Sequence, residues 1–89
     1  MPERIISIQN KLGLHARASA KLASEASRFN CDISLIKESI EVNCKSIMGI
    51  MMLAACKGTA LTVRAEGDDA DMALEAICAL VNDRFGEGE

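Results

Sequence analysis

The spacing of hydrophobic residues switches repeatedly between period two and helical spacing along this chain of 89 residues, and this alternation restricts its fold. Alternating, β-branched segments predict strands at 5–8, 31–35, 40–43 and 59–66. Helical spacing predicts helices that begin at 16, at 46 and at 68 or 69, the second running to about residue 55. Because the strands alternate in polarity, each buries one face, which favours an antiparallel sheet covered by helices on one side. We therefore expect one α+β domain, residues 1–89, in the order β-α-β-β-α-β-α, with the strand order left open.

Charge and aromatic content exclude several classes of function. The chain has 10 Lys and Arg residues against 13 Asp and Glu residues, a net charge of −3, and its only aromatic residues are two Phe. Nucleic-acid binding needs clustered positive charge or aromatic stacking faces, so no nucleic-acid partner is expected. The longest apolar run, 47–56, is too short to span a membrane, and the start lacks a signal-peptide pattern. We expect a cytoplasmic protein that does not insert into a membrane.

The distribution of cysteine and histidine argues against a metal site. Cys31, Cys44, Cys56 and Cys78 form no C-x-x-C pair, and a single histidine cannot supply a site built from several His ligands. Cysteine is among the residues most often buried in protein interiors. We expect buried free thiols, no metal and no cofactor.

The only histidine, His15, directly precedes the helix expected from Ala16. The first N–H groups of a helix lack internal partners and, together with the helix dipole, favour an anion. Arg17 is close in sequence, and its guanidinium group can donate to phosphate oxygens. Two interpretations follow from the residues alone: His15 is a nucleophile whose phosphorylated form is stabilised here, or it is an ordinary polar residue at a helix start.

Two segments of the chain resemble a known family. Residues 10–17, Asn-Lys-Leu-Gly-Leu-His-Ala-Arg, resemble the active-site segment of the HPr family, the histidine-containing phosphocarriers of the bacterial phosphoenolpyruvate-dependent sugar phosphotransferase system. Residues 45–51, Lys-Ser-Ile-Met-Gly-Ile-Met, resemble the regulatory-serine helix of the same family, at a matching separation. The resemblance implies an open-faced β-sandwich, with a four-stranded antiparallel sheet in the order 1-4-2-3 and three helices on one face.

The resemblance also implies a function. Enzyme I, charged from phosphoenolpyruvate, would phosphorylate His15 on Nδ1, and the phosphoryl group would pass to an enzyme IIA domain while Arg17 stabilises it. The protein would be a stoichiometric phosphohistidine carrier in sugar transport rather than a free-standing enzyme. HPr kinase/phosphorylase, where encoded, would phosphorylate Ser46, which can also cap a helix. The chain departs from most relatives at Ala18, where they have proline.

The helix expected after Ser46 is apolar on nearly every side. Ile50, Leu53 and Ala54 suffice for one buried stripe, so the remaining apolar side chains should be exposed and mark a contact surface. Flexible methionine suits a surface that accepts several partners, although the same methionines could instead fill gaps in the core. Small residues of the first helix would let a partner approach His15, and Arg17, Lys21 and Lys45, expected near it, would steer acidic partners. The expected docking residues are Ala16, Ala20, Lys45, Ile47, Met48, Met51 and Met52.

We expect a monomer whose partners are enzyme I, enzyme IIA domains and, where encoded, HPr kinase/phosphorylase. Two other functions stay open. One is a phosphocarrier of the nitrogen-related branch of the phosphotransferase system, and the other is a non-catalytic binding module in which His15 and the methionine-rich helix only dock a partner.

Overall fold

A computed structural model describes residues 2–86, and its elements follow the predicted order. The strands are β1 (Glu3–Ser7), β2 (Asp32–Lys37), β3 (Ile40–Asn43) and β4 (Ala60–Glu66). The helices are α1 (Ala16–Ala26), α2 (Ile47–Met52), α3 (Ala70–Asn82) and a short 3₁₀ turn, η1 (Arg84–Gly86). The helix expected to reach about residue 55 therefore ends earlier, and η1 was not foreseen.

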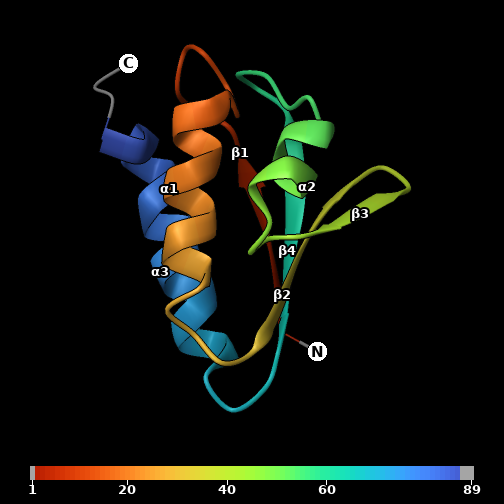
Figure 1. The fold of residues 1–89 in the computed structure, drawn as a ribbon, viewed down its shortest axis with the longest axis vertical. Coiled ribbons are helices and arrows are strands. Elements are labelled where there is room, and N and C mark those ends of the chain that lie inside the picture. The colour runs from red at the N-terminus through yellow and green to blue at the C-terminus, as the bar shows by residue number, and fades with distance from the viewer. Residues whose placement is uncertain (1, 87–89) are drawn as a thin grey trace.

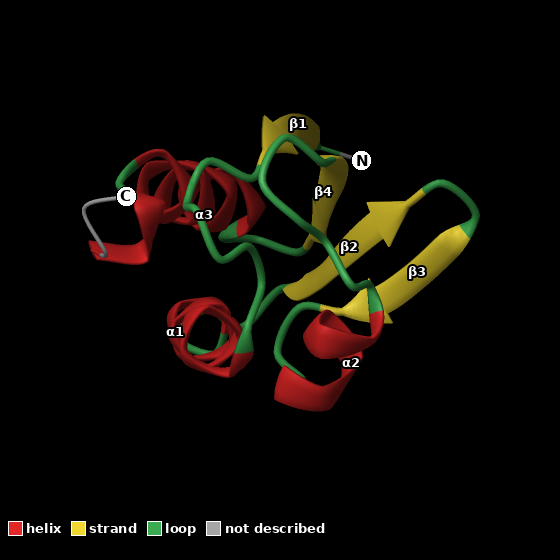
Figure 2. Ribbon diagram, turned by 90° about the horizontal axis from the view of Figure 1, so that it is seen from above, coloured by secondary structure: helices red, strands yellow, loops and turns green. Residues whose placement is uncertain are grey.

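The four strands form one antiparallel sheet in the order β1-β4-β2-β3, which confirms the order expected from the family resemblance. In the register, Ile6 lies opposite Leu61 between β1 and β4, and Leu35 lies opposite Val63 between β2 and β4. Figure 1 shows α1 and α2 in front of the strands, with α3 behind α1 and to the left of the sheet, and the view from above in Figure 2 places all three helices on one side of the sheet.

The core lies between that sheet face and the helices. Leu61, Val63 and Ala65 of β4 are buried, whereas Thr62 and Arg64 between them are half-buried on the other face, as a period of two requires. The helices contribute Ala18, Leu22 and Ala26 from α1 and Ala73, Leu74, Ile77 and Val81 from α3. Phe85 of η1 is 1% exposed and belongs to the same core.

The four cysteines do not share one environment. Cys31 and Cys44 are buried free thiols, as expected, and Cys78 is half-buried. Cys56 is exposed, so the expectation of burial is wrong there. It lies in the loop between α2 and β4, where its N–H donates to Thr59 Oγ1 at 3.1 Å and its side chain is left at the surface.

α3 begins at Ala70, one residue after the later of the two predicted starts, and the side chain of Asp69, directly before it, makes no capping bond to the helix. Its carboxylate instead accepts the N–H groups of Asn30 at 2.9 Å and Cys31 at 3.0 Å. Across residues 2–86, the helices are all too short or too polar to cross a membrane.

Candidate functional site

The loop between β1 and α1 is held against the segment that follows α2. Gly13 has φ +68°, and a Cβ at this position would lie 2.5 Å from the carbonyl oxygen of Ala55. The Leu14 N–H donates to that same oxygen at 3.0 Å, and Asn10 Nδ2 donates to the Gly13 carbonyl at 2.7 Å. Only glycine allows this approach, so the loop enters α1 from a defined direction.

His15 is the residue that caps α1. Its backbone is extended, with φ −76° and ψ −179°, and its carbonyl oxygen accepts the Ser19 N–H at 2.8 Å. The N–H groups of residues 16–18 have no acceptor within the helix. The half-buried imidazole therefore lies at the positive end of the helix dipole, where an added anion is stabilised.

His15 lines a surface hollow of about 680 Å³. Lys11, Arg17 and Lys21 line the same hollow, and no carboxylate of the described residues does. Lys21 is fixed, because its Nζ donates to the Phe85 carbonyl oxygen at 2.6 Å. The structure thus brings Arg17 to His15, as expected, and adds Lys11, which sequence reasoning did not single out although it lies within the histidine motif.

The short helix α2 borders this region. Ser46 caps it, and its Oγ accepts the Gly49 N–H at 3.1 Å, which confirms the expected cap. Ile50 and Leu53 are buried, as expected, but Ala54 is exposed. The reason is that α2 ends at Met52 and the backbone turns to φ +51° at Ala54.

The remaining apolar side chains of α2 are at the surface. Met48 and Met52 are each 74% exposed, Ile47 is 44% exposed and Met51 is 43% exposed, so these methionines do not fill gaps in the core. In Figures 1 and 2, α2 lies beside α1, on which Ala16 and Ala20 are exposed. The end of α2 that carries Met51 and Met52 leads into Ala55, which touches the loop before His15. The docking residues expected on α1 and α2 are thus exposed on two neighbouring helices.

Lys45 is placed differently from the sequence expectation. Its Nζ donates to the Phe29 carbonyl oxygen at 2.8 Å, beyond the last residue of α1, Ala26. His15 caps the opposite end, and a helix of 11 residues is about 16 Å long. Lys45 therefore does not flank His15, because a backbone carbonyl at the far end of α1 holds its ammonium group.

Comparisons with known proteins agree on one family. The family model described as "PTS HPr component phosphorylation site" matches residues 2–83. The phosphocarrier protein HPr of Pseudomonas aeruginosa is 50% identical, with all of both chains covered. The phosphocarrier protein NPr of Shewanella violacea is 46% identical over 96% of this chain and 93% of that protein.

Solved structures agree as well. A crystal structure of HPr from Thermoanaerobacter tengcongensis superposes with a TM-score of 0.94 and 45% identity, covering 98% of each chain. A dimer of HPr from the same organism superposes with a TM-score of 0.79 and 45% identity, covering 98% of this chain and 100% of that chain.

Proposed function

The chain belongs to the HPr family of phosphocarrier proteins of the phosphotransferase system, and on that basis we propose that His15 is the residue that carries the phosphoryl group. The observation that carries this proposal is the position of His15, which caps α1 and lines a hollow whose charged residues, Lys11, Arg17 and Lys21, are all basic. Both features favour a negatively charged group on the imidazole.

The chemistry needs one nucleophile from this chain. A lone pair of the neutral imidazole, on Nδ1 by the family resemblance, attacks the phosphorus atom of phosphorylated enzyme I. The new N–P bond forms as the bond between phosphorus and enzyme I breaks. In the next transfer an enzyme IIA domain attacks the same phosphorus atom, and the N–P bond to His15 breaks. Charge spread over the phosphoryl oxygens would then be stabilised by the N–H groups at the start of α1 and by the cation of Arg17, which lines the same hollow.

The test is phosphorylation from phosphoenolpyruvate. The protein is incubated with enzyme I, Mg²⁺ and labelled phosphoenolpyruvate, and the label is tested for the acid lability of a phosphohistidine. We expect a stoichiometric acid-labile label in the native chain and none in His15→Ala. Label retained by His15→Ala would refute the assignment, and absence of label in the native chain would support the binding-module function instead.

We propose a regulatory role for Ser46, a half-buried residue whose hydroxyl oxygen caps α2. A phosphate there would add about two negative charges beside the exposed side chains of α2, and its effect would therefore fall on partner binding. Incubation with HPr kinase and ATP should give an acid-stable phosphate that is absent from Ser46→Ala. Phosphate that persists in Ser46→Ala would show that another residue is phosphorylated and would contradict the proposal.

We propose that enzyme I and enzyme IIA domains dock on the apolar surface of α1 and α2. Its expected members are Ala16, Ala20, Ile47, Met48, Met51 and Met52, with Lys45 at its outer edge. A carrier has to release each partner quickly, which suits a small interface.

We further propose that the protein acts as a monomer in the cytoplasm. The core closes within one chain, and the free thiols fit a reducing compartment. A single species of about 9.5 kDa in light scattering would support the monomer, and a stable dimer would contradict it.

The identity to NPr of Shewanella violacea supports one second candidate, a carrier of the nitrogen-related branch. The two differ in the acceptor, so the test measures transfer from the phosphorylated chain to enzyme IIA domains of each branch. Faster transfer to a sugar-branch domain supports the first function, and faster transfer to a nitrogen-branch domain supports the second.

A further inference from the structure

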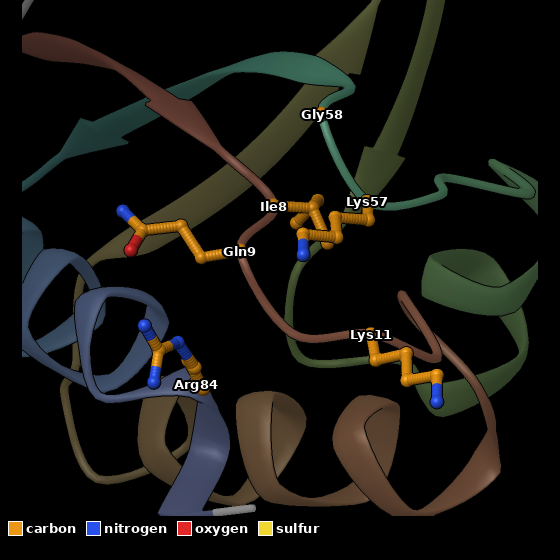
Figure 3. A pocket seen from close by; sticks show the side chains of 6 residues that line it. All are labelled: Ile8, Gln9, Lys11, Lys57, Gly58 and Arg84. Atoms are coloured by element: carbon orange, nitrogen blue, oxygen red, sulfur yellow. The ribbon is translucent and has the colours of Figure 1, made fainter. Parts of the chain in front are cut away.

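A second hollow lies outside the His15 site. It measures about 550 Å³ and is lined by Ile8, Gln9, Lys11, Lys57, Gly58 and Arg84. Its three cations come from three separate segments, namely the loop after β1, the loop before β4 and η1 (Figure 3). No carboxylate of the described residues lines it, although the chain as a whole carries a net charge of −3.

The cations of this hollow differ from most others on the protein. Several cations elsewhere are held by an acceptor within residues 2–86: Lys21 by Phe85 O, Arg28 by Glu25, Lys37 by Leu53 O, Lys45 by Phe29 O and Arg64 by Glu3. Lys11, Lys57 and Arg84 are exposed and form no ion pair within the described part of the chain. Grouping like charges without a counter-charge costs energy, which a bound anion removes.

The backbone conformation that positions Arg84 is strained. Arg84 and Phe85 both have φ +55°, a conformation that is unfavourable for residues other than glycine. Buried Phe85 and the bond from Lys21 Nζ to its carbonyl oxygen hold this segment in place. In Figure 3 the guanidinium group of Arg84 projects from the η1 segment toward Gln9, across the hollow from Lys57. Strain of this kind persists where the surroundings impose it and is concentrated at functional sites.

The loop before β4 is also fixed. Gly58 has φ +90°, and its N–H donates to the Ile8 carbonyl oxygen at 2.7 Å. This bond draws Lys57 toward the end of β1, so that its ammonium group lies beside Ile8 in Figure 3. The conformation of η1 and the bond from Gly58 to Ile8 therefore place Arg84 and Lys57 at the same hollow.

We propose that this hollow binds a small phosphorylated metabolite that carries more than one negative charge. Its volume lies within the range of about 300–1,000 Å³ that is typical of small-molecule sites, and all the charged residues that line it are basic. The site does not depend on phosphorylation of His15. Lys11, however, lines both hollows, so a bound polyanion would compete with the phosphoryl group for that charge.

The test uses inorganic pyrophosphate as the probe and the full chain labelled with nitrogen-15, at about 0.15 M salt so that weak surface attraction is screened. We expect saturable shifts of the Gln9 and Gly58 amide signals. The variants Lys57→Gln and Arg84→Gln remove cations that line this hollow alone, and together they should weaken binding at least about tenfold. If Arg84→Gln does not fold, Lys57→Gln alone should still weaken binding measurably.

Two control variants locate the anion. Arg17→Gln removes a cation of the His15 hollow only, and Arg4→Gln removes an exposed cation that lines no described hollow, so neither should weaken the shifts at Gly58. Shifts that centre on Ala16 and are lost in Arg17→Gln would place the anion at His15 and overturn the proposal. Shifts that do not saturate, or that are unchanged in the double variant, would also overturn it.

Discussion

At the scale of single residues, the position of His15 depends on a contact that only glycine permits. Gly13 brings the loop within hydrogen-bond distance of Ala55, and the next residue, Leu14, makes that bond. A side chain at Gly13 would displace the loop that leads directly into His15. The histidine motif therefore contains a residue needed for close backbone packing, Gly13, as well as the proposed nucleophile, His15.

We predict that Gly13→Ala destabilises the fold by about 2–3 kcal/mol, because it combines a positive φ with a Cβ placed 2.5 Å from the Ala55 oxygen. Urea unfolding measures the loss. Gly58→Ala is the matched control, since Gly58 also has positive φ but a Cβ there would meet nothing within 4 Å. It should cost about 1 kcal/mol. Equal losses would show that contact with Ala55 contributes little.

Arg17 is exposed and lines the hollow beside His15, so its charge should act on the transfer and not on the fold. We predict that Arg17→Gln slows phosphoryl transfer from enzyme I at least about tenfold, with unfolding free energy changed by less than about 0.5 kcal/mol. Arg28→Gln, which removes an exposed arginine near the other end of α1, should leave the rate unchanged. An unchanged rate in Arg17→Gln would remove its assigned role.

The cysteines should differ in reactivity. Burial raises the pKa of the Cys44 thiol to about 12, and burial together with Asp69 raises the pKa of the Cys31 thiol, so neither forms the reactive thiolate readily. We predict that a thiol reagent at pH 8 modifies exposed Cys56 first and Cys44 only after unfolding, as peptide mass spectrometry would show. Cys56→Ser should lack the fast phase, and a fast phase that persists there would contradict the prediction.

At the scale of elements, the apolar side chains of α2 have two separate roles, one in the core and one at the surface. Ile50 and Leu53 anchor the helix in the core, whereas Met48 is 74% exposed. An exposed apolar side chain contributes little to folding but gains from burial against a partner. The two roles can therefore be separated by substitution.

We predict that Met48→Gln weakens enzyme I binding about tenfold and leaves the melting temperature nearly unchanged, because the side chain is already exposed. Binding is measured by calorimetry. Met72→Gln is the matched control: Met72 is 66% exposed on α3, outside the proposed docking surface. Equal effects of the two variants on binding would argue against docking at α2, and a large loss of stability in Met48→Gln would show that Met48 belongs to the core.

The local spacing of hydrophobic residues was sufficient to predict most helices and strands, because each of them buries one face. β3 has the predicted bounds, Ile40–Asn43, and β4 differs by one residue. The end of α2 could not be predicted, since it depends on the backbone turn at Ala54. Strand order was not in the pattern either, because it depends on which strands pair over long distances, and the family resemblance supplied it.

The site was predictable to the extent that it lies in one motif. His15 and Arg17 are close in sequence, so their proximity was foreseen. The bond from Lys21 to Phe85 spans 64 positions and depends on how α1 and η1 pack, which local spacing does not encode. The same holds for Lys45, whose acceptor at Phe29 is known only from the fold.

At the scale of the whole molecule, one carboxylate joins two connections at the end opposite His15. Asp69 accepts N–H groups from Asn30 and Cys31, so the loop after α1 is tied to the turn between β4 and α3. Figure 1 places both of these connections at the bottom of the molecule, whereas the loop that leads into α1 is at the top. Acid should therefore loosen the protein from this end.

The hydrogen bond from the Asn30 N–H, together with those from Cys31, lowers the pKa of Asp69 below its usual value. Folding thus favours the ionised carboxylate, so its stabilising effect is fully present above about pH 4 and is lost as pH falls through the lowered pKa.

We predict that Asp69→Asn reduces the free energy of unfolding at pH 7, and that the difference from the native chain shrinks below about pH 4, because asparagine does not titrate. Urea unfolding at both pH values measures this. Asp68→Asn makes the same charge change at an exposed neighbour that accepts no hydrogen bond from residues 2–86, so it should show little effect at either pH. A loss in Asp69→Asn that is equal at both pH values would mean that the carboxylate acts through its shape and not its charge.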